Sequence, residues 1–360
     1  MTTDPSAMTQ ENLPSPCRVS IIIKALNEER GIEASIESAL RAVSAVGGEV
    51  ILADSCSIDR TVELAMRYPI RIVQLKQPSE RCCGAGPQLG YQHSTGAFIY
   101  ILDGDMLMLQ GFLEEALAVL ERRPDVAGVG GRVVELNNES LEYLAREQRV
   151  TAHRQAGRVD RLDGGGLYRR SAIENAGYFS DRNLHSYEEY DLALRLRALG
   201  WSLWRVSRAS ATHFGHDAPP YRLLMRRWGN RYVCGLGELI RAAAGQPRLP
   251  MLLMGLRELR LYLAVLAWWA VLFSVLLWPL SVAARWGAFC TLLTAPVLLM
   301  TWRKRSLEKA IYSVVSWCFH AAGLVRGLLH TPRPPRAIIS SRVIQEPARF
   351  NVDTARGATP

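Results

Sequence analysis

Short apolar runs alternate with amphipathic stretches from Arg18 to Asp103. Runs such as Val19-Ser20-Ile21-Ile22-Ile23 are typical of strands buried on both faces, and the stretches between the runs have helical periodicity. We expect strands at 19–23, 49–53, 70–75 and 97–102, and helices at 32–46, 61–67 and 86–94. Strands and helices that alternate through short links predict an α/β fold, with a parallel sheet covered on both faces.

The pattern is less regular between residues 126 and 240. A strand is expected near 126–134, and a strand-like run follows at 203–206. The glycine run 164–166 predicts either a plain turn or a loop that lets another group approach the backbone closely. An acidic segment, 186–191, opens a helix that is expected to end at Gly200, a residue common directly after helices.

Three apolar stretches dominate the C-terminal third. Residues 261–280 carry no charge and are long enough to cross ~30 Å of hydrocarbon, and 286–302 are near the lower limit for a span. A third stretch, 311–329, contains His320 and Arg326 and repeats its apolar positions helically. We expect two transmembrane helices and a third helix in the membrane interface, with three spans as the alternative.

The net charge of +9 supports a membrane more than a nucleic acid as partner. Residues 241–360 hold 15 lysines and arginines against 4 acidic residues, whereas residues 1–240 hold 28 against 30. The basic excess therefore lies in the most apolar third, which is typical of contact with membrane lipid. Arg303-Lys304-Arg305 follows the second span, as expected for a cytoplasmic end of a membrane helix. Residues 1–16 have no signal-peptide pattern, so what precedes the first span is expected to stay in the cytoplasm. We expect a protein of the inner (plasma) membrane with its N-terminal part in the cytoplasm.

These patterns divide the chain into four parts. We expect a disordered N-terminus at 1–17, an α/β domain at 18–250, a membrane region at 251–330 and a basic cytoplasmic tail at 331–360. The seven cysteines form no Cys-x-x-Cys pair, which predicts free thiols instead of disulfides or a structural zinc site.

Carboxylates stand at the ends of the predicted strands, where open α/β sheets bind ligands. Asp54 ends the second strand, and Asp103-Gly104-Asp105 ends the fourth. Two carboxylates separated by one glycine can turn toward the same cation, and oxygen ligands of this kind suit Mg²⁺ or Mn²⁺. Asp54 is placed to accept hydrogen bonds from a base or a ribose, and Asp59 is expected to cap the next helix.

The ordered set of these motifs resembles the family 2 inverting glycosyltransferases, which have the GT-A fold. The resemblance covers roughly residues 18–235 and rests on 19–29, Asp54 to Thr61, Asp103-Gly104-Asp105 and Glu188 to Arg195. It implies a membrane-bound enzyme that moves a sugar from a nucleotide-diphosphate donor to a lipid-linked or saccharide acceptor. The expected setting is cell-envelope or exopolysaccharide synthesis, with Mg²⁺ or Mn²⁺ as cofactor.

The resemblance also implies roles for individual residues. The expected catalytic residues are Glu189, as the base, and Glu188 beside it. The expected nucleotide-sugar-binding residues are Ala25, Asn27, Glu28, Asp54, Arg81 and Asp103, and the expected metal ligands are Asp103, Asp105 and His213. The base position also has a physical rationale. Inversion at an anomeric carbon needs a base near the acceptor hydroxyl, and the first turn of a helix keeps a carboxylate ionised.

Some positions depart from the family pattern. Lys24 and Leu26 replace the usual proline and aromatic residue, Ser55 replaces a frequent aspartate, and Pro87-Gln88 stands where Arg-Asn is common. Leu224 stands where processive synthases have glutamine before Arg-Trp, which argues against processive synthesis.

Two other functions fit parts of the sequence. A polyprenyl-phosphate glycosyltransferase would use the lipid phosphate itself as acceptor and would need little help from a base. A non-catalytic membrane protein with a degenerate nucleotide fold is disfavoured, because Asp103, Asp105 and Glu189 are all carboxylates. A dinucleotide-binding domain is disfavoured too, because the turn after the first strand, 25–31, has no glycine cluster.

Overall fold

The computed structural model describes residues 17–136, 155–214 and 219–347, so nearly all of the N-terminal segment expected to be disordered lies outside the described residues. The strands are β1 (Val19–Ala25), β2 (Gly48–Asp54), β3 (Arg71–Leu75), β4 (Phe98–Asp103), β5 (Met106–Met108), β6 (Val126–Glu135), β7 (Gly157–Val159), β8 (Leu167–Arg169), β9 (Ser202–His213) and β10 (Ser341–Gln345). The helices of the α/β domain are α1 (Ile32–Val46), α2 (Thr61–Ala65), η1 (Pro78–Glu80), α3 (Ala85–Gln92), α4 (Phe112–Arg122), α6 (Arg170–Ala176) and α7 (Glu188–Ala198). The helices that follow are α8 (Pro220–Gly229), η3 (Tyr232–Cys234), α9 (Gly235–Ala243), α10 (Leu249–Gly255), α11 (Arg257–Leu277), α12 (Val282–Lys304) and α13 (Leu307–Leu329).

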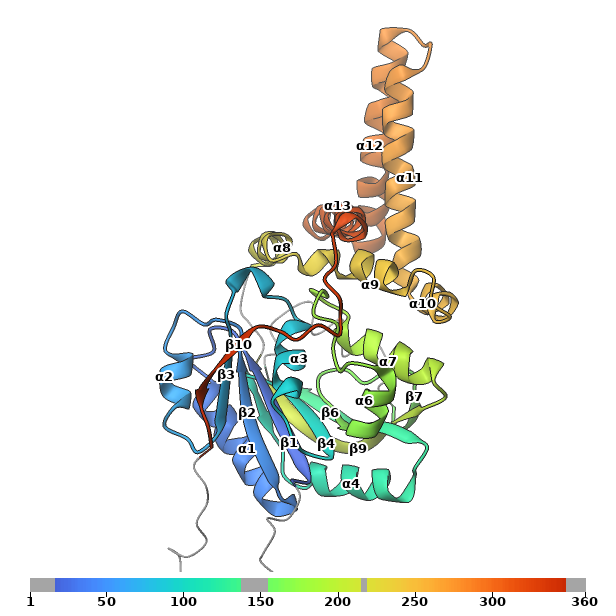
Figure 1. The fold of residues 1–360 in the computed structure, drawn as a ribbon. Helices are drawn as coiled ribbons and strands as arrows, with labels where there is room; N and C mark the ends of the chain where they lie inside the picture. Colours follow the sequence, from blue (N-terminus) through green and yellow to red (C-terminus); the bar gives the residue numbers. More distant parts are fainter. Residues whose placement is uncertain (1–16, 137–154, 215–218, 348–360) are drawn as a thin grey trace, which may run out of the picture.

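One mixed sheet forms the centre of the α/β domain, with strand order β10-β3-β2-β1-β4-β8-β6-β9-β5 and β7 on β9 (Figure 1). Strands β1 to β4 are parallel, which confirms the expectation for the first half of the domain. Beyond β4 the sheet changes character: β8 is antiparallel to both of its neighbours, and β6 and β9 are parallel to each other.

The continuous apolar run of β1 is explained by the two layers of helices. Ile21 and Ile23 are fully buried in a cluster that includes residues of α1 and α4. Ile22, which points to the other face, is buried in a second cluster with residues of α3, α6 and α7. Because successive side chains of a strand alternate between faces, only a strand covered on both sides reads as unbroken apolar sequence.

The register of β1 brings the functional strand ends together. At its carboxyl end, Ala25 pairs with Asp54 of β2, and Lys24 pairs with Asp103 of β4. Parallel strands end at the same edge of the sheet, so three polar strand ends lie side by side.

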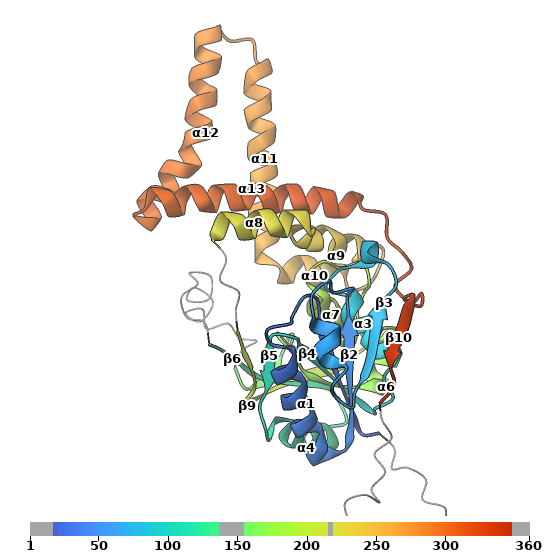
Figure 2. The same cartoon turned by 90° about the vertical axis from the view of Figure 1, so that its left-hand side faces the viewer.

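Helices α11 and α12 form a hairpin that projects from the rest of the molecule, and α13 crosses its base at a steep angle (Figure 2). Among the described residues, α11 and α12 are the two helices long and apolar enough to cross a membrane. Helix α13 packs closely on α9: a Cβ atom at Gly237 would lie only 2.1 Å from the Leu324 carbonyl oxygen, so only glycine fits there. Small residues at this contact allow the close approach.

The chain after α13 returns to the α/β domain. Part of the segment that the sequence suggested as a basic tail is strand β10, which pairs antiparallel with β3 at the edge of the sheet (Figure 1). Arg182, in the loop before α7, also donates hydrogen bonds to the Ala337 and Ile338 carbonyl oxygens. The C-terminal segment and the α/β domain therefore belong on the same side of any membrane that the hairpin crosses.

This arrangement predicts the topology. Reporters fused before Met1 and after Pro360 are expected to indicate the same side of the membrane in cells, because two spans return the chain to its starting side. Reporters on opposite sides would require a third span and would contradict the pairing of β10 with β3.

Candidate active site

Three carboxylates gather at the carboxyl edge of the sheet: Asp103 at the end of β4, Asp105 before β5 and Glu28 after β1. Gly104 makes this grouping sterically feasible, since a Cβ atom there would lie 2.8 Å from the Glu28 Cγ atom. Burial, and then repulsion from Asp105 and Asp103, raises the pKa of Glu28 to about 7. Glu28 therefore keeps its proton to a higher pH than an exposed glutamate, mainly because it is buried and in addition because Asp105 and Asp103 are near.

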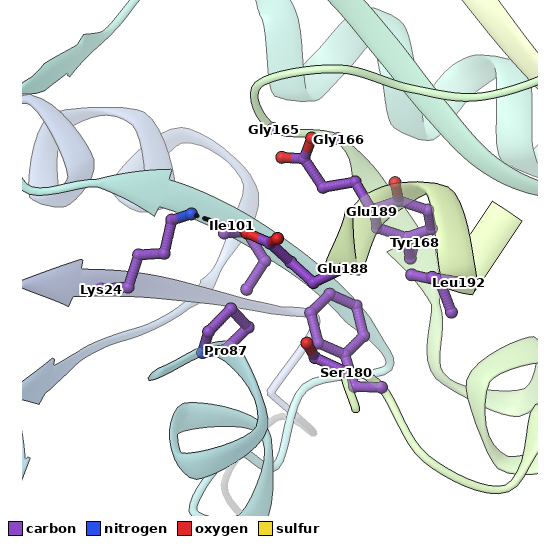
Figure 3. A pocket seen from close by; sticks show the side chains of 11 residues that line it. Lys24, Pro87, Ile101, Gly165, Gly166, Tyr168, Ser180, Glu188, Glu189 and Leu192 are labelled. Carbon is purple, nitrogen blue, oxygen red and sulfur yellow. Dashed lines mark hydrogen bonds and ion pairs between the residues drawn. The ribbon is translucent and has the colours of Figure 1, made fainter. Parts of the chain in front are cut away.

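Lys24 places a cation among the carboxylates. Its Nζ atom lies 3.1 Å from Asp103 Oδ1 and 3.5 Å from Glu188 Oε1. Burial disfavours the charged amine, but Asp103 and Glu188 outweigh it and raise the pKa of Lys24 above its ordinary value. Figure 3 shows the Glu188 side chain pointing at Lys24 across a cavity of about 20 Å³. Lys24 thus links Asp103 at the end of β4 to Glu188 of α7.

Glu189 follows Glu188 in the first turn of α7 but takes another direction. Its carboxyl group extends toward Gly165 and Gly166, on the opposite side of the cavity from Lys24 (Figure 3). Burial and the nearby Glu188 carboxylate raise the pKa of Glu189 to about 8. This corrects the expectation that the first turn of the helix keeps the carboxylate ionised, because at neutral pH the protonated form of Glu189 is favoured. Once ionised, Glu189 is a stronger base than an ordinary glutamate, so added positive charge in the site would have to release its proton before it could act on an acceptor hydroxyl.

His213, at the end of β9, lies between two carboxylates. Its Nε2 atom is 3.1 Å from Asp105 Oδ2, and its Nδ1 atom is 2.5 Å from Glu135 Oε1. Burial opposes the charged ring, but Asp105 and Glu135 outweigh it and raise the pKa of His213 to about 9. The protonated ring offers no lone pair, so His213 would have to lose a proton before it could bind a metal ion.

The residues present fit a divalent cation by charge and by atom type. Glu28, Asp103 and Asp105 offer only oxygen atoms, as Mg²⁺ and Mn²⁺ prefer, and Asp105 and Asp103 contribute after burial to the raised pKa of Glu28. In the described part of the chain, no group of three or more acidic, histidine or cysteine side chains is already arranged around one metal position. Other ligands, such as phosphate oxygens, would have to complete the coordination.

Asp54 is fully buried at the end of β2. Its Oδ2 atom accepts hydrogen bonds from the Ser57 backbone NH, at 3.0 Å, and from Gln74 Nε2, at 2.6 Å. Its Oδ1 atom is buried and has no hydrogen-bond partner. A buried carboxylate oxygen without a partner is energetically costly, so Oδ1 marks a place for an external donor.

The side chain of Gln74 is itself held by the C-terminal strand, because its Oε1 atom accepts a 2.7 Å hydrogen bond from Arg342 Nε of β10. Two hydrogen bonds, from Arg342 to Gln74 and from Gln74 to Asp54, therefore connect strand β10 to the buried carboxylate.

The remaining expected binding residues surround Asp54. The Asn27 side-chain oxygen accepts a 2.8 Å hydrogen bond from the Ile58 backbone NH, so Asn27 joins the loops after β1 and β2. Asp59 accepts a 3.0 Å hydrogen bond from the Thr61 backbone NH, in the turn before α2. The expectation that Asp59 caps this helix is wrong, because Arg60 is the N-cap residue and no side chain caps the helix there. Arg81 donates to the Cys56 carbonyl oxygen, and its buried Nε atom has no partner. Ala25 lines the strand end beside Asp54.

The segment before α7 is tied to the helices beyond the α/β domain. His185 donates a backbone hydrogen bond of 3.0 Å to the buried Glu238 of α9. Ser186 donates to the Tyr232 carbonyl oxygen, at 2.8 Å, and Tyr187 donates to Glu258 of α11, at 3.1 Å. These three contacts hold the segment directly before α7, whose first turn carries Glu188 and Glu189.

Comparison with known proteins identifies the family. Residues 20–177 match the model of glycosyl transferase family 2. Over 204 residues the chain is 30% identical to EpsE of Bacillus subtilis (strain 168), which is named as a glycosyltransferase, and the match covers 53% of this chain and 71% of EpsE. The chain belongs to glycosyl transferase family 2. It is therefore an enzyme that transfers glycosyl groups.

Two further similarities describe the fold and a more distant relative. The mannosyltransferase PcManGT from Pyrobaculum calidifontis, solved in complex with GDP-Man and Mn²⁺, aligns with a TM-score of 0.57 over 88% of this chain and 89% of that one, at 18% identity. This likeness confirms the expected GT-A fold. A dolichol-phosphate mannosyltransferase of Pyrococcus furiosus is 23% identical over 121 residues, which are 32% of this chain and 34% of that protein.

Several residues of this glycosyltransferase site are not recognisable as functional from the sequence. In the sequence, Lys24 is notable only because it replaces the proline that is usual in the family. Glu135 and Gln74 reach the site through strand pairing, and Arg342 through a strand in the C-terminal segment. A search for polar residues in otherwise apolar strands would have found Gln74 and Glu135.

The raised pKa of Glu189 predicts an effect on stability. Glu189→Gln is expected to raise the thermal unfolding temperature more at pH 8.5 than at pH 5. The unfolded glutamate ionises near pH 4.5, whereas the folded one resists ionisation until about pH 8, so the wild-type fold loses stability as the pH rises between these values. Unfolding of both proteins in detergent across this pH range measures the difference, and a difference independent of pH would contradict the prediction.

Proposed function

We propose that this glycosyltransferase is a membrane-bound inverting enzyme that moves a sugar from a nucleotide-diphosphate donor to a lipid-linked acceptor. The observation that carries the proposal is Glu189, a partly buried carboxyl group with a raised pKa, beside a cavity whose other wall leads through Lys24 to Asp103. An inverting transfer needs such a base on one side of the sugar and a charged site for the leaving diphosphate on the other.

The donor is proposed to bind along the carboxyl edge of the sheet. Asp54 Oδ1 would accept a hydrogen bond from the nucleoside, and Arg81 Nε, also without a partner, would donate to the donor. Asp103, Asp105 and Glu28 would hold Mg²⁺ or Mn²⁺, which when bound stabilises negative charge on the diphosphate. The similarity to PcManGT, which was solved with both GDP-Man and Mn²⁺ bound, supports this arrangement.

The transfer itself is proposed to be a single displacement. Glu189 takes the proton of the acceptor hydroxyl as its oxygen forms a bond to the anomeric carbon, and the bond from that carbon to the diphosphate oxygen breaks. The nucleoside diphosphate leaves with the bonding electron pair, and the configuration at the carbon inverts. Lys24 holds Glu188 in place beside this path and balances the charge of Asp103.

The acceptor is proposed to reach the enzyme from the membrane. Helices α11 and α12 are the candidate spans, and the cluster Arg303-Lys304-Arg305 would remain in the cytoplasm together with the α/β domain. Nucleotide sugars are made in that compartment, which agrees with this orientation. Cell-envelope or exopolysaccharide synthesis is the pathway proposed for such an enzyme.

A second candidate is a polyprenyl-phosphate glycosyltransferase. The similarity to the dolichol-phosphate mannosyltransferase of Pyrococcus furiosus favours it. In that reaction the acceptor phosphate is already ionised, so Glu189 would contribute little to the rate.

Glu189→Gln separates the two candidates. The variant is expected to bind the donor like the wild type and to lower kcat by about 10²–10⁴-fold, the usual contribution of a general base. A screen of nucleotide sugars including GDP-mannose, read as nucleoside diphosphate release, first identifies the donor. A near wild-type kcat would favour the polyprenyl-phosphate enzyme, and a loss of donor binding would mean that Glu189 lies on the donor side of the sugar.

The proposed donor pocket predicts a graded effect on donor affinity. Asp54→Ala is expected to weaken donor binding by about 1–3 kcal/mol, because hydrogen bonds to a charged group are lost. Arg342→Ala is expected to weaken it by about 1 kcal/mol, roughly fivefold, because Gln74 loses the contact that orients it.

Calorimetric titration with the donor measures both effects, with Arg122→Ala on the exposed end of α4 as the matched control. Unchanged affinity in Asp54→Ala would contradict the pocket, and unchanged affinity in Arg342→Ala alone would contradict the role of β10.

A further inference from the structure

A second cavity, of about 460 Å³, lies between α13 and the segment formed by η3 and α9. Its polar lining includes Arg231, Arg326 and His330, and its apolar lining includes Ala322, Val325 and Leu329 of α13. It shares no lining residue with the cavity that contains Glu188 and Glu189. It is therefore distinct from the candidate active site.

The cavity has two arginines, Arg231 and Arg326, against one carboxylate, Glu238. Within the described residues, neither Arg231 nor Arg326 forms an ion pair with a carboxylate: Arg231 lies 2.9 Å from His330 Nε2, and Arg326 donates to the Trp228 carbonyl oxygen at 3.3 Å. The one acidic residue of the lining, Glu238, already accepts hydrogen bonds from the His185 backbone and lies 2.9 Å from its ring. Two guanidinium groups are thus available to an anion.

The backbone at Arg231 supports a binding role. Arg231 has φ 63°, a left-handed conformation that glycine or asparagine adopts at lower cost. Strained conformations of this kind cluster where a side chain has to be aimed at a ligand. Here the conformation belongs to an arginine that lines the cavity.

The apolar side of the cavity lies next to the membrane region. Val325 and Leu329 are exposed on α13, the helix that crosses the base of the α11–α12 hairpin (Figure 2). A ligand with an anionic head and an apolar tail would match the arginines on one side and these residues on the other. A free anion would use only the arginines.

We propose that this cavity binds the phosphate or diphosphate group of a lipid, namely the lipid that carries the sugar acceptor. The inference rests on the proposed function and specifies its acceptor. Glu238 of the cavity contacts His185, three residues before Glu188, a separation of at most about 11 Å along the backbone. The phosphate therefore lies near the catalytic carboxylates without being the nucleophile, and it holds the lipid while a sugar hydroxyl reacts.

Binding of farnesyl diphosphate to the full chain in detergent, without donor, tests the site, and inorganic pyrophosphate serves as the tail-free probe. We expect farnesyl diphosphate to bind at least tenfold more tightly than pyrophosphate. Arg231→Gln should weaken farnesyl diphosphate binding about tenfold or more, whereas Arg231→Lys, which keeps the charge, should stay within about threefold of the wild type. Arg222→Gln removes the same charge from the exposed face of α8 and should have no effect.

Three results would overturn the proposal: equal affinity for the two probes, an equal loss in Arg222→Gln, or no loss in Arg231→Gln. Donor binding, measured on the same proteins, should be the same in Arg231→Gln and the wild type. A wild-type protein that binds the donor but not farnesyl diphosphate would refute this inference and leave the glycosyltransferase proposal intact. A protein that binds farnesyl diphosphate but no nucleotide sugar would contradict the proposed function; the cavity would then be a lipid-phosphate site, but not the site of a sugar acceptor.

Discussion

Repulsion between carboxylates is the constraint on which the site depends. The register of β1 with β2 and β4 brings Glu28 close to Asp103 and Asp105, while α7 adds Glu188 and Glu189 from the other side. Two protein cations oppose this repulsion, Lys24 between Asp103 and Glu188 and the His213 ring between Asp105 and Glu135. Burial first, and the acidic neighbours second, raise the pKa values of Glu28 and Glu189 despite these two cations. A donor diphosphate with its divalent cation would enter a site prepared for positive charge.

The helices and the strand beyond the α/β domain contribute to the geometry of the candidate active site. Contacts to Glu238 of α9 and Glu258 of α11 fix the segment that precedes Glu188, and the strand that follows α13 reaches Asp54 through Arg342 and Gln74. The donor side and the base side of the site are therefore each connected to elements beyond the α/β domain. Helix α13 in turn packs closely on α9 at Gly237. Removal of the C-terminal helices would accordingly alter the candidate site.

Local patterns in the sequence predicted the first half of the fold well, because each strand from β1 to β4 is an apolar run and α1 begins and ends where its periodicity does. The short strands β5, β7, β8 and β10 were not foreseen, since three to five residues carry little periodicity and their pairing depends on distant partners. The same limit applies to the site. Asp54, Asp103 and Glu189 stand in recognisable motifs, whereas Lys24 and Glu135 acquire their meaning only when β4, α7 and β9 place charges beside them.

We propose that the carboxylates of Glu28, Asp103 and Asp105 form a site whose charge a divalent cation completes. Binding of Mn²⁺ to the full chain in detergent, followed by electron paramagnetic resonance in the presence of the donor's nucleoside diphosphate, tests it most directly. We expect one bound Mn²⁺ per chain in the wild type and an affinity for Mn²⁺ at least tenfold lower in Asp105→Asn. Absence of bound Mn²⁺ in the wild type, or equal binding in the variant, would contradict it.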